Sequence, residues 1–174
     1  DGKTGDGAGI HVEIPKDFFI EKIEVTGHDY DNAEICVGMI FLPRNDYAAQ
    51  ESCKTIVESE LSKNNFSIYG WRQVPVNPKV LGDKALQTMP EIIQVLFKSN
   101  DINLLDKKLE RKIYETRKRI ENKAFQLSLN NFYVCSISSK SIIYKGLYLA
   151  EAISDFYLDL KDKRFVSRYA IFHQ

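Results

Sequence analysis

The sequence has no excess of charge of either sign. Its 174 residues include 24 Lys and Arg and 24 Asp and Glu, which gives a formal net charge of zero at pH 7. Domains that bind nucleic acid usually carry a basic excess. No apolar run approaches the ~20 residues of a membrane-spanning helix, and runs such as Ile35–Leu42 have the length of a strand. We therefore expect neither nucleic acid nor a membrane as a partner.

Cysteine and histidine are also scarce. The three cysteines, Cys36, Cys53 and Cys135, are odd in number, lie far apart and form no Cys-x-x-Cys pair. Each has apolar neighbours, which favours buried, reduced thiols and a reducing compartment, so we expect a cytoplasmic protein. The three histidines show no spacing typical of metal ligands, and we predict no metal site.

Linkers, repeats and low-complexity tracts are absent, and the length fits one domain. Hydrophobic periodicity predicts helices and strands in mixed order, with strands both adjacent and separated by helices, which favours an α+β or layered α/β fold. A turn at Ser139-Lys140 predicts a β-hairpin. The predicted strands are Ala8–Ile14, Glu34–Leu42, Phe66–Val76, Glu91–Phe97, Phe132–Ser138 and Ser141–Tyr144, with a last one from about Arg168; the main helices are Asp46–Lys63, Asp101–Lys123 and about Leu147–Phe156.

Several short motifs favour ordinary structural roles. Gly2-Lys3-Thr4 lacks the first half of a phosphate-binding loop, and a strand rather than a helix follows it. Asp29-Tyr30-Asp31 lacks the glycine and distal glutamate of a calcium loop. The basic residues between Lys107 and Arg119 are interleaved with acidic ones, which is typical of a solvated helix face.

The most unusual stretch runs from Gly70 to Asn77 and contains the only tryptophan, Trp71, followed by Arg72. Trp and Arg at the end of a strand suit a flat or carboxylate-bearing ligand. Equally, the tryptophan could pack over a loop with the arginine on its ring. The residues alone leave both interpretations open.

Several stretches in the same order carry a family resemblance: Asp1-Gly-Lys-Thr-Gly-Asp-Gly-Ala-Gly-Ile10, Tyr69-Gly-Trp-Arg-Gln-Val-Pro75, Phe132-Tyr-Val-Cys-Ser136, Ser141-Ile-Ile-Tyr-Lys-Gly146, Arg164-Phe165 and Phe172-His173. Together the sequence resembles the class II glutamine amidotransferase domain of the large subunit of glutamate synthase, of the bacterial type. The resemblance covers nearly the whole chain.

The resemblance implies an α+β fold of the N-terminal-nucleophile hydrolase type, a four-layer α/β/β/α sandwich, here incomplete. It implies glutamine hydrolysis by an N-terminal cysteine whose α-amine serves as base. That cysteine is expected upstream of Asp1, so residues 1–174 form a partial domain with no catalytic residue, inactive by itself. The parent enzyme is expected to use FMN, an iron–sulfur cluster and NAD(P)H or ferredoxin, all outside this chain, and to aminate 2-oxoglutarate with the ammonia.

Site residues follow from the same resemblance. Asp6 and Gly7 match an element close to the nucleophile, and we expect Trp71 and Arg72 to border the glutamine pocket with them. The expected partners are glutamine and the remaining domains of the parent, with contact to a second copy at an exposed sheet edge along Ala8–Ile14 or Ala170–Phe172. The alternative function is a non-catalytic amidotransferase-like module that binds glutamine or a partner protein.

Overall fold

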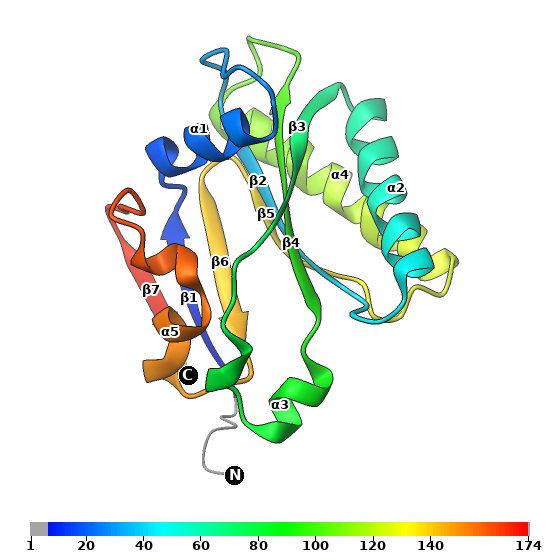
Figure 1. Ribbon diagram of the computed structural model, residues 1–174. Coiled ribbons are helices and arrows are strands. Elements are labelled where there is room, and N and C mark those ends of the chain that lie inside the picture. The colour runs from blue at the N-terminus through cyan, green and yellow to red at the C-terminus, as the bar shows by residue number, and fades with distance from the viewer. Residues whose placement is uncertain (1–6, 174) are drawn as a thin grey trace.

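The computed structural model describes residues 7–173 and contains two antiparallel sheets (Figure 1). Sheet A has the strand order β6-β1-β7, and sheet B has the order β3-β4-β2-β5. The strands are β1 (Ala8–Glu13), β2 (Cys36–Leu42), β3 (Phe66–Gln73), β4 (Glu91–Ser99), β5 (Tyr133–Ser138), β6 (Ser141–Gly146) and β7 (Ala170–His173). The helices are α1 (Lys16–Val25), α2 (Tyr47–Lys63), α3 (Asp83–Thr88), α4 (Asp106–Gln126) and α5 (Ile153–Phe156), with short 3₁₀ turns at Pro78–Val80, Ala150–Ala152 and Leu158–Lys161.

Helices α2 and α4 cover one face of sheet B, and sheet A lies against the other (Figure 1). The residues between sheet B and the helices form one apolar cluster, which includes Leu61 and Ile113. The residues between the two sheets form a second cluster, which α1 and α5 complete with Phe18 and Phe156. The described residues thus supply a helix layer and two sheet layers. The mixed α+β class and the stacked sheets confirm the fold class.

Sheet B is built from a βαββαβ unit, β2-α2-β3-β4-α4-β5, the split βαβ arrangement, with a 3₁₀ turn and α3 inserted between β3 and β4. Its central strands β2 and β4 are almost fully buried because both of their faces are covered. This accounts for the continuous apolar run at Ile35–Leu42, which lacks the alternation of a half-exposed strand. Asp46 begins α2, where its carboxylate accepts a hydrogen bond from the backbone N–H of Ala49 at 2.9 Å.

The predicted hairpin of Phe132–Ser138 and Ser141–Tyr144 is wrong. Strand β5 pairs with β2 in sheet B, whereas β6 pairs with β1 in sheet A, so the turn between them carries the chain from one sheet to the other. Glu110 of α4 holds this turn, since its carboxylate accepts hydrogen bonds from Ser138 Oγ at 2.9 Å and from the backbone N–H of Ser139 at 2.6 Å. A contact this distant in sequence leaves no signal in local periodicity.

Two helix boundaries also differ from the prediction. Asp101 does not begin the longest helix, because its carboxylate accepts from Asn103 N at 3.0 Å in a local turn, and α4 begins at Asp106. The segment from Leu147 to Phe156 is a 3₁₀ turn followed by the single-turn helix α5 rather than one helix.

The outer edge of β7 is exposed in the part of the chain that the structure describes. Strand β1 has a partner on each side, so Ala8–Glu13 is not a free edge. Strand β7 pairs only with β1 among residues 7–173, and its Ile171 and Phe172 are 59% and 67% exposed. Of the two expected edges, the structure therefore leaves Ala170–Phe172 open, a surface that suits pairing with another strand.

The loop before β2 is fastened by Asp31, which predicts an acid-sensitive contact. Its carboxylate accepts hydrogen bonds from Lys98 and Tyr69, which lower the pKa of Asp31 to about 2. A lowered pKa in the folded state contributes stability above the unfolded pKa of about 3.9, and this contribution is lost as the pH falls through about 2. We expect Asp31→Asn to lose less free energy of unfolding between pH 5 and pH 2 than the parent chain does, as measured by urea unfolding. The exposed neighbour variant Asp29→Asn is the control, and an Asp31→Asn profile identical to the parent's would refute the role.

Candidate functional site

The two ends of the described chain meet at one end of sheet A. Gly9 of β1 lies opposite both Lys145 of β6 and His173 of β7. Gly7 has a positive φ of 118°, a conformation that suits glycine, and a Cβ built there would lie 3.7 Å from the carbonyl oxygen of Gly146. The start of β1, the end of β6 and the end of β7 therefore converge beside Leu147.

The absence of a side chain at Gly9 leaves room for the imidazole of His173. A Cβ on Gly9 would lie 2.6 Å from His173 Nε2 and 3.0 Å from Lys145 Cβ, closer than side chains approach one another. The glycine thus lets the imidazole lie across β1.

We expect Gly9→Ala to displace β7 and to lower the free energy of unfolding by about 1–3 kcal/mol through overpacking. Urea unfolding together with amide exchange of the β7 residues measures this. Because the clash is chiefly with the imidazole, the double variant Gly9→Ala/His173→Ala should regain much of the loss. An equal loss in the single and double variants would disprove the contact.

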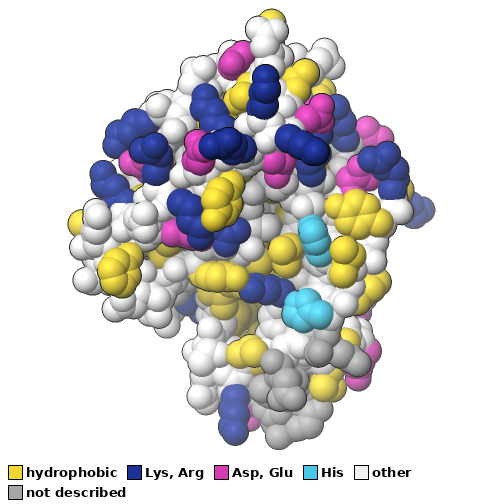
Figure 2. All heavy atoms as spheres, turned by 180° about the vertical axis from the view of Figure 1, so that it is seen from behind, with side chains coloured by type: hydrophobic (Ala, Val, Ile, Leu, Met, Phe, Trp, Pro, Cys, Tyr) yellow, Lys and Arg dark blue, Asp and Glu magenta, His cyan; other side chains and the backbone are white. Residues whose placement is uncertain are grey.

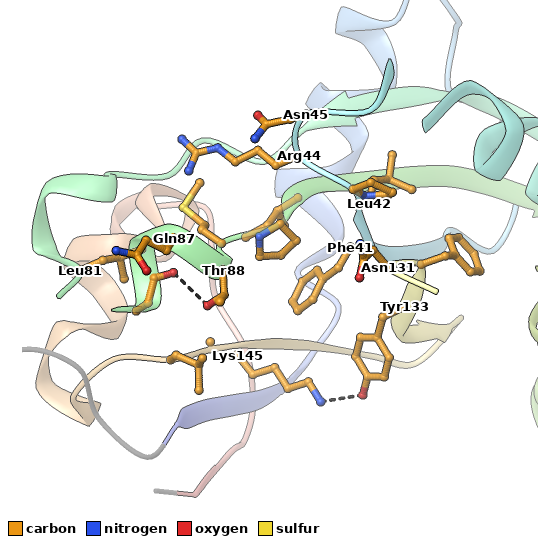
Figure 3. Close-up of a pocket in the computed structure, with 18 of the residues that line it drawn as sticks. Phe41, Leu42, Arg44, Asn45, Leu81, Gln87, Thr88, Asn131, Tyr133 and Lys145 are labelled. Carbon is orange, nitrogen blue, oxygen red and sulfur yellow. Dashed lines mark hydrogen bonds between the residues drawn. The ribbon is translucent and has the colours of Figure 1, made fainter. Parts of the chain in front are cut away.

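A cavity of about 840 Å³ lies next to this convergence (Figure 3). Its walls come from the segment that follows β2, from α3 and the chain after it, from the segment before β5, and from the end of β6. Phe41, Leu42 and Tyr133 supply apolar surface, and Arg44 and Lys145 reach it from different elements (Figure 3). Lys145 Nζ donates to the Tyr133 hydroxyl at 2.6 Å, and Arg44 Nη1 donates to the Leu86 carbonyl at 3.3 Å.

Of the four predicted site residues, the structure describes Gly7, Trp71 and Arg72. Asp6 lies outside the described residues, and Gly7 lies beside the cavity through Gly146 and Leu147. Trp71 and Arg72 point to opposite faces of β3, as neighbours on a strand do. Trp71 packs against the cluster beneath α2 and α4 and donates from Nε1 to Glu58 at 2.7 Å. That either side chain contacts glutamine stays a prediction.

Arg72 belongs to a buried polar network between the two sheets. Its guanidinium donates two hydrogen bonds to Asp159, both at 2.8 Å, and a third to Gln94 Oε1 at 2.6 Å. The hydroxyl of Tyr144, itself fully buried, donates to Asp159 at 3.0 Å and is 3.2 Å from Gln94 Nε2. Burial alone would lower the pKa of Arg72, but the hydrogen bonds and charge of Asp159 raise it, so the Arg72 guanidinium stays charged.

This network joins β3, β4 and β6 to the 3₁₀ turn at Leu158–Lys161. The backbone of that region is fixed as well, since Leu158 N donates to Pro75 O at 3.1 Å and Asn77 N donates to Phe156 O at 2.9 Å. Sequence reasoning missed Asp159 as the buried partner of Arg72. The available signal was an acid between Leu158 and Leu160, because a carboxylate in an apolar run needs a buried partner.

None of the three thiols is activated. Cys36, Cys53 and Cys135 are all buried and unbonded to one another. Burial raises the pKa of Cys53 to about 11 and that of Cys135 to about 12, and it raises the pKa of Cys36 further. A nucleophilic cysteine needs a lowered pKa and access to substrate, so these thiols do not fit that role or the ligation of an iron–sulfur cluster.

Between Gly7 and His173, no three side chains of the His, Cys, Asp or Glu type come together as a metal-binding group. Among the helices within the same residues, none combines the length and hydropathy needed to span a membrane. Two ion pairs lie along α4: Arg111–Glu115 is exposed, whereas Arg117–Glu121 is partly buried. The space-filling view from behind shows such basic and acidic side chains interspersed (Figure 2).

Comparison with known proteins places the chain in a family. The model of the family described as "Glutamine amidotransferases class-II" matches residues 1–174. The chain therefore belongs to that family. It is 48% identical over 174 residues to the glutamate synthase [NADPH] large chain of Azospirillum brasilense. The aligned region covers 100% of this chain and 11% of that protein. It is 39% identical over 176 residues to ferredoxin-dependent glutamate synthase 1, chloroplastic/mitochondrial, of Arabidopsis thaliana, with the same coverage. The chain thus spans about a ninth of the length of these relatives.

Proposed function

We propose that residues 1–174 form part of the glutaminase domain of a glutamate synthase large chain. In this proposal the domain hydrolyses glutamine to glutamate, and the ammonia aminates 2-oxoglutarate at a site elsewhere in the parent protein. The observation that carries the proposal is the 48% identity to a glutamate synthase large chain along the whole of this chain. The two stacked sheets support it, because they form the framework on which such a domain holds its reacting groups.

The proposal assigns glutamine to the end of sheet A where β1 begins. Asp6 and Gly7 border it there, supported by the position of Gly7 beside Gly146 and Leu147. The nucleophile is a cysteine other than Cys36, Cys53 and Cys135, since burial raises the pKa of all three. FMN, an iron–sulfur cluster and NAD(P)H or ferredoxin belong to other parts of the parent. The three free cysteines support a reducing, cytoplasmic location.

A second candidate is a non-catalytic module that binds glutamine or a partner protein. The observation in its favour is the same burial of every thiol in the chain. This candidate predicts saturable binding of glutamine, or of a partner, by the 174-residue chain alone.

A segment exchange separates the two candidates. The matching segment of the Azospirillum brasilense large chain is replaced by residues 1–174, and glutamate released from glutamine is measured in the purified exchange protein. We expect hydrolysis within about tenfold of the unmodified relative, because the framework is supplied intact. Loss of hydrolysis, together with saturable glutamine binding by the isolated chain in titration calorimetry, would replace the proposal with the binding module.

A further inference from the structure

The end of β6 beside Gly7 is held from outside sheet A. Strand β6 is an edge strand, since it pairs only with β1 within the described part of the chain. On its other side, the backbone N–H of Ile143 donates to Ser136 Oγ at 3.1 Å, and Cys135 Sγ donates to the Ile143 carbonyl at 3.5 Å. Backbone groups of alternate residues point to the same side of a strand, so the carbonyl of Lys145 also points to this outer side.

Tyr157 supplies the hydrogen-bond partner of that carbonyl. Its hydroxyl donates to the Lys145 carbonyl oxygen at 2.8 Å, and its side chain is fully buried. The ring packs edge-to-face against Tyr144 and Phe156, with ring centroids 4.8 Å apart in both pairs. A closely packed ring cannot turn without displacing its neighbours. The place of the hydroxyl is therefore set by the backbone of Tyr157.

The backbone of Tyr157 is in turn fixed by the segment that leaves sheet B. Val76, which follows β3, forms an isolated antiparallel β-bridge with Tyr157. The residues on either side of Tyr157 are hydrogen-bonded to the backbone of Pro75 and Asn77. Tyr157 thus joins the chain after β3, in sheet B, to the end of β6, in sheet A.

This contact lies at the end of sheet A to which the proposed function assigns glutamine. Lys145 is opposite Gly9 of β1, and the next residue, Gly146, is opposite Ala8. A Cβ built on Gly7 would lie 3.7 Å from the Gly146 carbonyl oxygen. A shift of the end of β6 therefore displaces the start of β1, and Gly7 with it.

We propose that Tyr157 is a positioning residue for glutamine, because its hydrogen bond to the Lys145 carbonyl sets where the end of β6, and thereby Gly7, lies. The inference rests on the proposed function, which assigns glutamine to this end of sheet A. The hydroxyl acts through the backbone that it holds. Its loss should therefore weaken the binding of glutamine in the ground state and in the transition state alike, a change that raises KM and leaves kcat unchanged.

Tyr157→Phe in the exchange protein tests this, because it removes the hydroxyl and keeps the ring. We expect the KM for glutamine to rise at least about fivefold, with kcat within about twofold and ammonium-dependent glutamate formation unchanged. A merely structural role would reduce the amount of folded enzyme, which lowers the apparent kcat and leaves KM unchanged. Tyr30→Phe is the matched control, since the Tyr30 hydroxyl also donates to a backbone carbonyl, that of Ala33 at 3.0 Å in the loop before β2. It should alter neither constant.

Amide hydrogen exchange in the same proteins measures the state of β6 independently of catalysis. Tyr157→Phe should speed exchange in the peptide that contains Lys145 and Gly146 at least about fivefold and leave α4 unchanged. Unchanged exchange in that peptide, or an unchanged KM in an exchange protein that hydrolyses glutamine, would overturn the inference while the proposed function stands. An exchange protein that hydrolyses no glutamine defeats the proposed function, and the role in glutamine binding with it, whereas faster exchange in β6 would still show that Tyr157 holds the strand.

Discussion

Replacing Arg72 by alanine is expected to lower the free energy of unfolding by about 3–5 kcal/mol, the usual cost of removing one partner of a buried ion pair. The side chain of Asp159 is only 3% exposed, and Arg72 supplies two of its hydrogen bonds. Without the guanidinium, the carboxylate is buried and uncompensated, and Gln94 loses a donor as well. Urea unfolding of the 174-residue chain measures the loss.

Two comparisons make this prediction specific. Arg111→Ala removes a similar ion pair from the surface of α4, where Arg111 is 82% exposed, and should cost no more than about 0.5 kcal/mol. Replacing both partners, as Arg72→Met with Asp159→Leu, should regain much of the single-variant loss because no buried charge remains unpaired. A loss of less than about 1 kcal/mol in the free energy of unfolding for Arg72→Ala would show that the buried network contributes little to stability.

The second large effect concerns catalysis. The purified 174-residue chain is expected to release no glutamate from glutamine above a buffer blank. Its Cys53 and Cys135 have pKa values raised by burial to about 11 and about 12, and Cys36 is affected in the same direction. At neutral pH their thiolate populations are therefore at least about a hundredfold below that of a free cysteine.

Alkylation by iodoacetamide checks the physical cause of that inactivity. In the folded chain the three thiols should react at least about a hundredfold more slowly than in urea, because both charge and access are missing. Mass spectrometry assigns the rate to each cysteine. Rapid alkylation of one thiol, accompanied by glutamine hydrolysis that the same alkylation abolishes, would instead identify that thiol as a nucleophile.

Elements whose pattern depends on local sequence were predictable. The helices near Asp46–Lys63 and Asp101–Lys123 and the buried strand near Glu34–Leu42 are present, since their apolar spacing reflects the surfaces they bury. The short helices were not predictable as such. Helix α3 is too short for the spacing of its apolar residues to indicate a helix. The change from a 3₁₀ turn to α5 between Ala152 and Ile153 likewise leaves no trace in that spacing.

Contacts between residues that lie far apart in the sequence were harder to predict. The residues Ser139-Lys140 are typical of a hairpin turn, yet β5 pairs with β2 and β6 pairs with β1, so the two strands belong to different sheets. Glu110 binds the turn between them. Likewise, the sequence showed that Trp71 and Arg72 were unusual, but their separate partners, Glu58 and Asp159, are set by the fold. The family resemblance, by contrast, was readable because its motifs recur in order along the chain.

The assignment of residues 1–174 to a glutaminase domain is tested by the ratio of glutamine-dependent to ammonium-dependent glutamate formation in the exchange protein. Added ammonium bypasses the amidotransferase step, so its rate reports whether the remainder of the large chain is intact. If residues 1–174 form part of the glutaminase domain, the ratio should stay within about tenfold of that of the unmodified Azospirillum brasilense protein. Ammonium-dependent synthesis at the unmodified rate with no glutamine-dependent synthesis would contradict the assignment.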